Sequence, residues 1–122
     1  MFKLVDVYEA VGCIKDGDTV AIGGAGAGHA VPDRLLQGLG EHYIKTGGPR
    51  KITALHPCGI GDNVSRGMNH LAHEGLIDTV IGGFWGNAPK MVQLALDICG
   101  SGRSWLHCHD RGLLHAGAIA EF

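Results

Sequence analysis

The sequence predicts an α/β fold with an open, mainly parallel sheet. Short apolar strands alternate with segments of helical spacing, and each predicted strand runs into a loop that contains glycines. Aromatic residues make up only 6% of a chain that is 45% hydrophobic, so a core must be built from Val, Ile, Leu and Ala. Alternating strands and helices favour βαβ units, whose strands are parallel. With 122 residues, the chain has the size of one small domain.

The first predicted element is a short helix over residues 5–14. Apolar side chains recur there at helical spacing, and the pair Asp6 and Glu9 is typical of a capping box. A turn rich in Asp and Gly then leads into residues 19–22, a short apolar run that ends at Gly23 and Gly24. Such a run predicts a buried parallel strand.

A longer helix is predicted over residues 33–44, where Leu, Tyr and Ile side chains mark one face. Pro32 suits the first turn of this helix, and the Gly-Gly-Pro run at 47–49 ends it. Residues 51–55 then predict a second strand, which runs into a loop at 56–62 that also contains glycines. The order of strand, glycine loop and helix is therefore repeated.

The same order is predicted a third time. Residues 69–74 are expected to form a short helix, residues 78–81 a third strand and residues 88–96 a helix, with the Gly-rich loop 82–87 before the last of these. In open α/β sheets, ligands bind at the carboxyl ends of the parallel strands. All three Gly-rich loops therefore belong at one edge of the sheet, which is the predicted ligand edge.

The loop over residues 23–28 invites comparison with nucleotide-binding loops. A dinucleotide fingerprint that starts at Gly24 would place His29 at its third glycine, and one that starts at Gly26 would place Val31 there. The loop also lacks the Lys-Ser/Thr pair of a P-loop. These mismatches disfavour a nucleotide site. A tight turn that lets the helix pack on its strand stays open as an alternative.

A wider pattern surrounds this loop. From Asp16 to Gly24 the chain reads Asp-Gly, two free positions, three apolar residues and Gly-Gly, and Pro32 follows. This pattern resembles the N-terminal signature of the family I CoA-transferases. The chain departs from that signature at Ala25, where the family has Phe, and at His29, where it has Gly.

The Gly-Ala-Gly-x-Gly order of the loop is closer to the propionate or acetate CoA-transferase branch, in which both halves of the enzyme are fused in one chain. Several further segments resemble that branch in order, so the resemblance spans about residues 5–96. These segments are Pro49–Thr53, Pro57–Asp62, Arg66-Gly67, Leu71–Leu76 and Gly83–Lys90.

The resemblance implies an open α/β sheet of the NagB/RpiA-like type and a ping-pong exchange of CoA between an acyl-CoA and a free short-chain carboxylate. In this family a glutamate attacks the thioester and becomes a glutamyl-CoA thioester, and backbone amides hold the oxyanions that form on the way. That glutamate lies in the second half of the fused enzyme, so no catalytic residue is expected here, and the chain alone is expected to be inactive. The residues expected to line the substrate and CoA site are Gly23, Gly24, Ala25, Gly26, Ala27, Gly28, Gly59, Gly61, Asp62, Phe84, Trp85, Gly86 and Asn87.

Some of these side chains have plain structural alternatives. Asp62 and Arg66 either line the substrate cleft or pair within their loop. Phe84 and Trp85 either wall the cleft or pack in the core. Glu74 precedes a glycine, but it matches the Glu-Gly-Leu segment of the N-terminal half and not the nucleophile motif, so it is expected to be a surface carboxylate.

The resemblance ends near Asp97, which divides the chain into two parts. Residues 1–97 are expected to be the N-terminal part of a CoA-transferase α/β domain, and residues 98–122 a divergent tail. The family continues into another strand and a Leu-Pro-x-Gly turn that the tail lacks, and truncation or a shifted reading frame near Asp97 would produce this difference. Within the tail, residues 113–120 could form a frayed helix.

The tail also raises a rival class of function, a non-catalytic α/β binding or structural module with a metal-binding tail. The candidate ligands are Cys99, His107, Cys108, His109 and His115. Structural zinc sites usually draw on paired Cys-x2-4-Cys or His-x3-5-His spacing, which these residues lack. No metal site is therefore expected.

Charge and composition limit the partners. The formal net charge of −2 favours neither nucleic acid nor a membrane surface, and no apolar run approaches the roughly 20 residues needed to cross a bilayer. The four cysteines form no CxxC pair, and no signal peptide precedes them, so a cytoplasmic location is expected. The resemblance implies acyl-CoA and a short-chain carboxylate as partners, CoA as a substrate with no other cofactor, and either a homo-oligomer or dependence on the missing C-terminal half. Short-chain fatty acid or ketone-body metabolism is the implied context.

Overall fold

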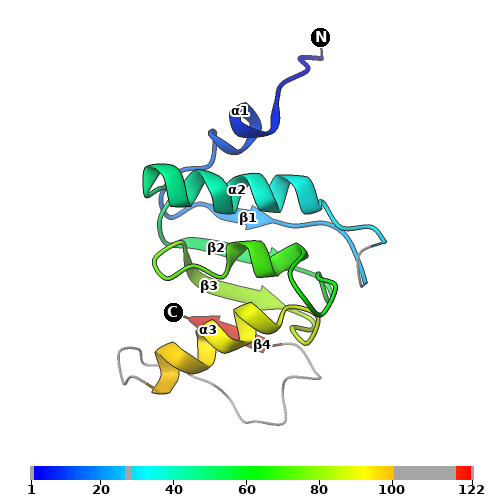
Figure 1. Cartoon of the computed structure of the whole chain (residues 1–122), viewed down its shortest axis with the longest axis vertical. Helices are drawn as coiled ribbons and strands as arrows, with labels where there is room; N and C mark the ends of the chain where they lie inside the picture. The colour runs from blue at the N-terminus through cyan, green and yellow to red at the C-terminus, as the bar shows by residue number, and fades with distance from the viewer. Residues whose placement is uncertain (1, 27–28, 101–117, 122) are drawn as a thin grey trace.

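The chain forms a four-stranded sheet with its described helices on one side (Figure 1). The computed structural model describes residues 2–26, 29–100 and 118–121. The elements in chain order are α1 (Val7–Val11), β1 (Thr19–Ala21), α2 (Asp33–Thr46), β2 (Ile52–His56), the 3-10 helix η1 (Gly67–Leu71), β3 (Ile77–Gly82), α3 (Pro89–Gly100) and β4 (Ala118–Glu121). The predicted α/β class with a mainly parallel sheet is confirmed.

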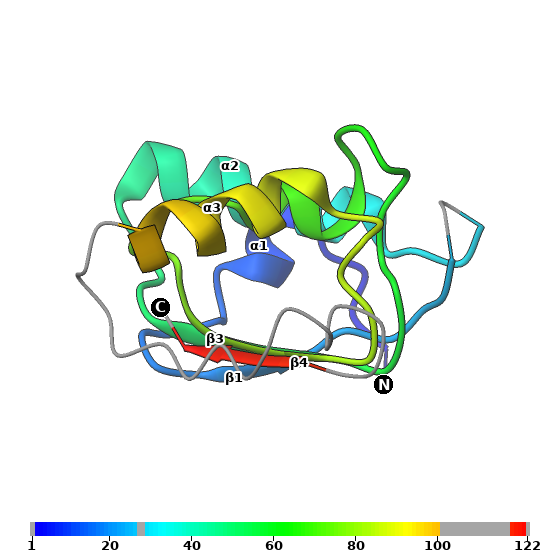
Figure 2. The same cartoon turned by 90° about the horizontal axis from the view of Figure 1, so that it is seen from below.

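The strands lie in the order β1-β2-β3-β4. The first three are parallel, with Val20 opposite Ala54 and Ala54 opposite Val80, and β4 joins β3 in the antiparallel direction. Side chains alternate between the faces of a strand, so Ala54 and Val80 point to the helical side, where both are fully buried. Helices α1, α2, η1 and α3 all cover this one face (Figure 2).

Local signals in the sequence explain where the helices begin and end. Asp6 caps α1 by accepting hydrogen bonds from the backbone N–H groups of Tyr8 and Glu9, both at 2.8 Å. The Glu9 carboxylate pairs with Lys3, so the hydrogen bonds of Asp6 are the half of the predicted capping box that is seen. Helix α2 ends at Thr46, and its cap residue Gly47 has a left-handed φ of 76° that lets its N–H reach the Tyr43 carbonyl at 2.7 Å.

The core lies between the sheet and these helices. Its largest fully buried side chains are Leu39, Ile52, Ile60, Met68, Leu71, Leu76, Met91 and Val80. At Gly40 the backbone of α2 comes so close to η1 that a Cβ would lie 3.2 Å from the His70 carbonyl carbon and would overlap its oxygen. This close approach fixes how α2 and η1 cross.

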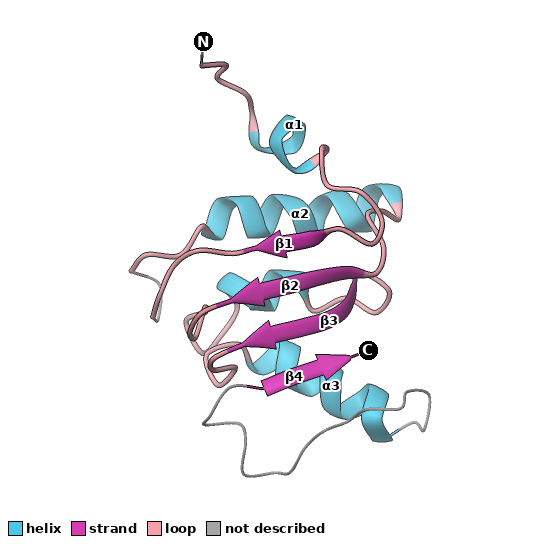
Figure 3. Cartoon of the chain, turned by 180° about the vertical axis from the view of Figure 1, so that it is seen from behind, coloured by secondary structure: helices cyan, strands magenta, loops and turns pink. Residues whose placement is uncertain are grey.

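The other face of the sheet carries no described helix, as the view from behind shows (Figure 3). By strand alternation this uncovered face carries one row of threonines and one apolar row. In register, the rows are Thr19-Thr53-Thr79 and Ala21-Leu55-Ile81. Leu55 is 42% exposed at the centre of the apolar row. Parallel sheets are usually covered on both faces, whereas the described helices of this chain cover one face only (Figure 2).

Some predicted elements differ from the structure. The helix expected over 69–74 is a 3-10 helix at Gly67–Leu71, and Pro32 precedes α2 as its cap residue. The helix expected over 113–120 is wrong for residues 118–120, which belong to β4. A four-residue segment without helical periodicity is stabilised there by backbone hydrogen bonds to the open edge of β3. Residues 113–117 lie outside the described part, and the division of the chain at 97 stays a prediction.

Candidate functional site

Three loops leave the carboxyl ends of the parallel strands at the same edge of the sheet (Figure 1). They comprise residues 22–32 after β1, 57–66 after β2 and 83–88 after β3. The predicted site residues are distributed over all three. Ala27 and Gly28 lie outside the described residues.

The first and second loops are joined by backbone and thiol hydrogen bonds. The N–H of Gly26 donates to the Gly59 carbonyl at 3.0 Å, and Gly26 forms a parallel bridge with Ile60. The Cys58 thiol donates to the Gly24 carbonyl at 3.2 Å. The structure therefore places Gly24, Gly26 and Gly59 next to one another.

The second and third loops are equally close. The N–H of Asn63 donates to the Asn87 carbonyl at 3.0 Å. A Cβ at Gly59 would lie 2.7 Å from Asn87 Nδ2 and 2.8 Å from Phe84 Cδ1, and a Cβ at Gly61 would overlap the Asn87 carbonyl oxygen. Glycine is needed at Gly61 because the colliding atom belongs to the backbone of the third loop, whereas at Gly59 side chains of that loop occupy the space.

The glycines of the first loop serve two different purposes. Gly24, with φ at 131°, turns the chain so tightly that a Cβ would overlap the Ala30 carbonyl oxygen, and the Ala25 N–H donates to the same oxygen at 3.2 Å. Gly24 thus forms a tight turn. At Gly26, with φ at 81°, a Cβ would meet no described atom within 4 Å. A side chain there would project into open space at the edge of the sheet, which Gly23 also lines as an exposed residue.

The aromatic pair divides between core and loop. Trp85 is only 5% exposed and packs in the hydrophobic core. Phe84 is half-buried and lies against Gly59 and Gly86, where added Cβ atoms would collide with its ring. Asn87 is also half-buried, and Gly86 is exposed.

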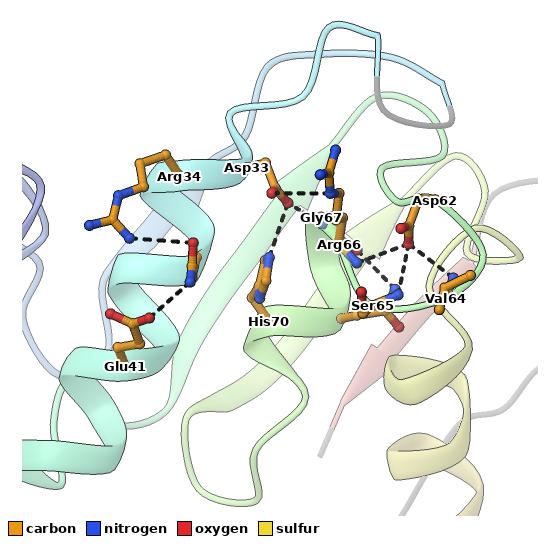
Figure 4. Close-up of polar contacts among 11 residues, drawn as sticks. Asp33, Arg34, Glu41, Asp62, Val64, Ser65, Arg66, Gly67 and His70 are labelled. Atoms are coloured by element: carbon orange, nitrogen blue, oxygen red, sulfur yellow. Dashed lines mark hydrogen bonds and ion pairs between the residues drawn. The ribbon is translucent and has the colours of Figure 1, made fainter.

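Asp62 is used to shape its own loop. Its Oδ1 accepts hydrogen bonds from the N–H groups of Val64 at 2.9 Å, Ser65 at 2.7 Å and Arg66 at 2.9 Å (Figure 4). These bonds, with that from Arg66 the largest contribution, lower the pKa of the Asp62 carboxyl to about 2. The Arg66 guanidinium turns instead toward Asp33, with 3.9 Å between Nε and Oδ2.

Asp33 connects the start of α2 with η1 (Figure 4). Its Oδ1 accepts from the Gly67 N–H at 2.8 Å and lies 3.0 Å from His70 Nε2. A carboxylate at the first turn of a helix is also favoured by the helix dipole. The sequence motifs did not single out Asp33, because its partners lie more than 30 residues away.

A separate pocket of about 260 Å³ opens on the helical side, between α2, η1 and the start of α3. Glu41, His70, His73 and Lys90 supply its titratable side chains. Burial lowers the pKa of His73, and the nearby Lys90 adds to this effect. None of the predicted site residues lines this pocket. Glu74, which the sequence placed at the surface, is exposed.

Comparison with known proteins gives relatives of one kind. The chain is 36% identical over 92 residues to the acetate CoA-transferase YdiF of Escherichia coli K12, and 28% identical over 114 residues to the caffeate CoA-transferase of Acetobacterium woodii. The crystal structure of YdiF from E. coli O157:H7, a thioester complex with CoA, covers 76% of this chain at 35% identity with a TM-score of 0.73. In sequence and in fold, the chain matches the N-terminal part of a family I CoA-transferase.

This match covers a small share of the longer CoA-transferases. The chain spans 17% of YdiF and 21% of the caffeate enzyme, and 18% of the crystallised YdiF chain. No protein-family model matches it. The apoenzyme of YdiF, also solved, superposes with the same TM-score of 0.73.

Two further features concern other classes of site. Within the described residues, no cluster of three or more His, Cys, Asp and Glu side chains could hold a metal ion. His107, Cys108, His109, His115 and the side chain of Cys99 lie outside that part. Among the described helices, none is long and apolar enough to cross a membrane.

Proposed function

We propose that this chain forms one wall of an acyl-CoA cleft in a CoA-transferase of the acetate or propionate type. One observation carries the proposal: three loops from the carboxyl ends of parallel strands are held together at one edge of a sheet that superposes on YdiF. This edge is where open α/β sheets bind ligands. The substrate class is an acyl-CoA with a short-chain carboxylate acceptor.

The hydrogen bonds limit what the first loop can do chemically. An oxyanion needs N–H donors that are aimed at it and not engaged elsewhere. The N–H groups of Ala25 and Gly26 already donate to Ala30 and Gly59. We therefore assign these two residues to shaping the cleft, with Gly26 leaving room for the substrate.

The proposal requires components beyond the residues described. The nucleophilic glutamate of the family has no counterpart here, so turnover depends on a polypeptide that supplies the C-terminal half, or on an oligomer that contains one. A cytoplasmic location is part of the proposal, since the spacing of the four cysteines gives no sign of a disulfide framework. Short-chain fatty acid or ketone-body metabolism is the context that the resemblance to the CoA-transferases implies. CoA acts as a substrate and no other cofactor is needed.

The binding role can be tested with two matched glycine variants. Gly26→Val places a branched side chain in the open space of the proposed cleft. Gly17→Val places the same side chain in the turn before β1, at the opposite edge of the sheet. Both glycines have a left-handed φ, 81° and 78°, and neither Cβ would meet a described atom within 4 Å. The two variants should therefore lose similar stability, roughly 1–2 kcal/mol.

Isothermal titration calorimetry with CoA should then separate them. The wild-type chain and Gly17→Val are expected to bind CoA with similar affinity, and Gly26→Val at least about tenfold more weakly, a difference of about 1.4 kcal/mol. Equal affinities for both variants would remove Gly26 from the cleft. A wild-type chain that binds no CoA at millimolar concentration would contradict the proposed function.

The second test concerns turnover. The purified chain should not exchange CoA between propionyl-CoA and acetate, because the family's nucleophile lies outside it. Chromatographic detection of acetyl-CoA, after removal of contaminating enzyme, would show that a residue of this chain performs the chemistry. Borohydride trapping of a thioester on any of its glutamates would show the same.

A further inference from the structure

His56 is a buried histidine at the carboxyl end of β2, between the core and the three loops. The residue is only 3% exposed. The ring packs on Gly82 of β3, where a Cβ would lie 2.9 Å from His56 Nδ1 and would overlap the far side of the ring. The neighbouring strand thus provides a glycine where the ring lies. Such a placement is costly for a polar side chain unless it makes a hydrogen bond.

The ring makes one specific hydrogen bond. Nδ1 lies 2.7 Å from the Cys58 carbonyl oxygen. A carbonyl oxygen only accepts, so Nδ1 must carry the proton and donate it. Burial lowers the pKa of His56, and the neutral ring with its proton on Nδ1 satisfies this bond. Histidine is therefore used here as a fixed donor.

The residue that His56 holds connects two loops. The Cys58 thiol donates to the Gly24 carbonyl at 3.2 Å, and the next carbonyl along the chain, that of Gly59, accepts the Gly26 N–H at 3.0 Å. Among the described residues, hydrogen bonds of Cys58 and Gly59 join the first loop to the second. Rotation of the peptide at Cys58 would move both of them.

We propose that His56 is a positioning residue, whose Nδ1–H bond to the Cys58 carbonyl keeps the first glycine loop seated against the second. The importance of this seating for acyl-CoA rests on the proposed function. The contacts between the loops do not depend on the proposed function, and they can be measured separately. Removal of the donor should loosen the contacts of Gly24 and Gly26 while the strands stay paired.

Two substitutions separate the hydrogen bond from the packing of the ring. Both His56→Asn and His56→Leu remove the imidazole ring, but the Asn amide can place an N–H where Nδ1 was, and Leu cannot. His56→Gln is a third variant, since its amide reaches toward the Nε2 position instead. If His56→Leu does not fold, the comparison of Asn with Gln tests the same bond.

The readouts report directly on the loops. Peptide mass spectrometry can follow the alkylation of Cys58, with the exposed Cys13 as internal reference. The rate of this alkylation should rise about tenfold in His56→Leu or His56→Gln. The rate of hydrogen exchange at the Gly26 amide should rise by a similar factor in the same variants. In His56→Asn both rates should stay near the wild-type values. Equal rates in all variants, or an equal rise in Asn and Leu, would overturn the proposal.

CoA titration of the same proteins connects the two proposals. His56→Leu should bind CoA more weakly, and His56→Asn should restore binding. If the wild-type chain binds no CoA but the loop rates change as expected, the proposed function fails and the positioning role stands. If the wild-type chain binds CoA and the loop rates do not change, the positioning role alone fails.

Discussion

Replacement of Gly61 by alanine should separate the second and third loops. An added Cβ would lie 2.8 Å from the Asn87 carbonyl carbon, would overlap its oxygen, and would lie 3.2 Å from the Arg66 oxygen. Ordinary contacts between carbon and carbonyl oxygen begin at roughly 3.3 Å. The colliding atoms are backbone, which a rotamer change cannot move. The loop after β3 must therefore shift.

The size of the effect follows from what this shift breaks. The Asn87 carbonyl accepts the Asn63 N–H at 3.0 Å, and loss of such a bond costs about 1 kcal/mol. Overpacking of a well-packed site adds about 1–3 kcal/mol. The expected loss in free energy of unfolding is therefore about 2–4 kcal/mol. This is a large share of the roughly 5–15 kcal/mol that a domain possesses.

Urea unfolding followed by circular dichroism, with linear extrapolation to water, would measure the loss in free energy of unfolding of Gly61→Ala. Gly17→Ala is the matched control, because it also replaces a loop glycine but its Cβ would meet no described atom within 4 Å. Its cost should be only that of a left-handed φ, about 1–2 kcal/mol. If Gly61→Ala loses no more stability than Gly17→Ala, the argument that the loops are locked together at Gly61 is refuted.

The remaining predictions concern a charge, a helix crossing and the sheet. The pKa of Asp62 is about 2 in the folded chain, below its value of 3.8 in the unfolded chain, so the carboxylate stabilises the loop fully above pH 3.8 and this stabilisation is lost as the pH falls through about 2. The amide NMR shifts of the loop should therefore titrate near pH 2. A titration midpoint near pH 3.8 would contradict this prediction. Gly40→Ala should lower the free energy of unfolding measured in urea, because the added Cβ would overlap the His70 carbonyl oxygen. This loss should exceed the gain of about 1 kcal/mol that alanine brings over glycine inside a helix. A more stable variant would show that α2 and η1 can move apart without cost. The chain should self-associate at micromolar concentration in sedimentation through the uncovered face of the sheet. Leu55→Lys on this face should shift the chain toward monomer, whereas the control Leu35→Lys on α2 should not. A wild-type chain that is monomeric and unfolds cooperatively would refute self-association through this face.

Much of the fold could be predicted because its signals are local. Residues 19–22 and 78–81 predicted strands that begin or end within a residue of β1 and β3, since apolar runs bounded by glycine are unambiguous over so short a length. The helix at 67–71 was less predictable. Its first N–H is satisfied by Asp33, which lies 34 residues earlier in the chain, and no nearby sequence signal announces this contact.

The candidate site divides in the same way. Topology alone predicted that the three loops share one edge, because parallel strands end together. The pairing of Gly26 with Gly59 could not be predicted, since it depends on the exact stagger of β1 and β2. The burial of His56 was also missed. The sequence offers a single clue, a histidine that directly follows four apolar or small strand residues.

The order β1-β2-β3 follows the order of synthesis. After β1, each parallel strand therefore finds its neighbour already made when it leaves the ribosome. The unit of β1, α2 and β2 is complete once His56 has emerged, and the bond from the Thr53 N–H to the Asp18 carbonyl, 2.9 Å long, can close at that stage. Domains generally fold from the N-terminus during synthesis. In this chain, pairing of the parallel strands can advance one crossover at a time, with no wait for a distant strand.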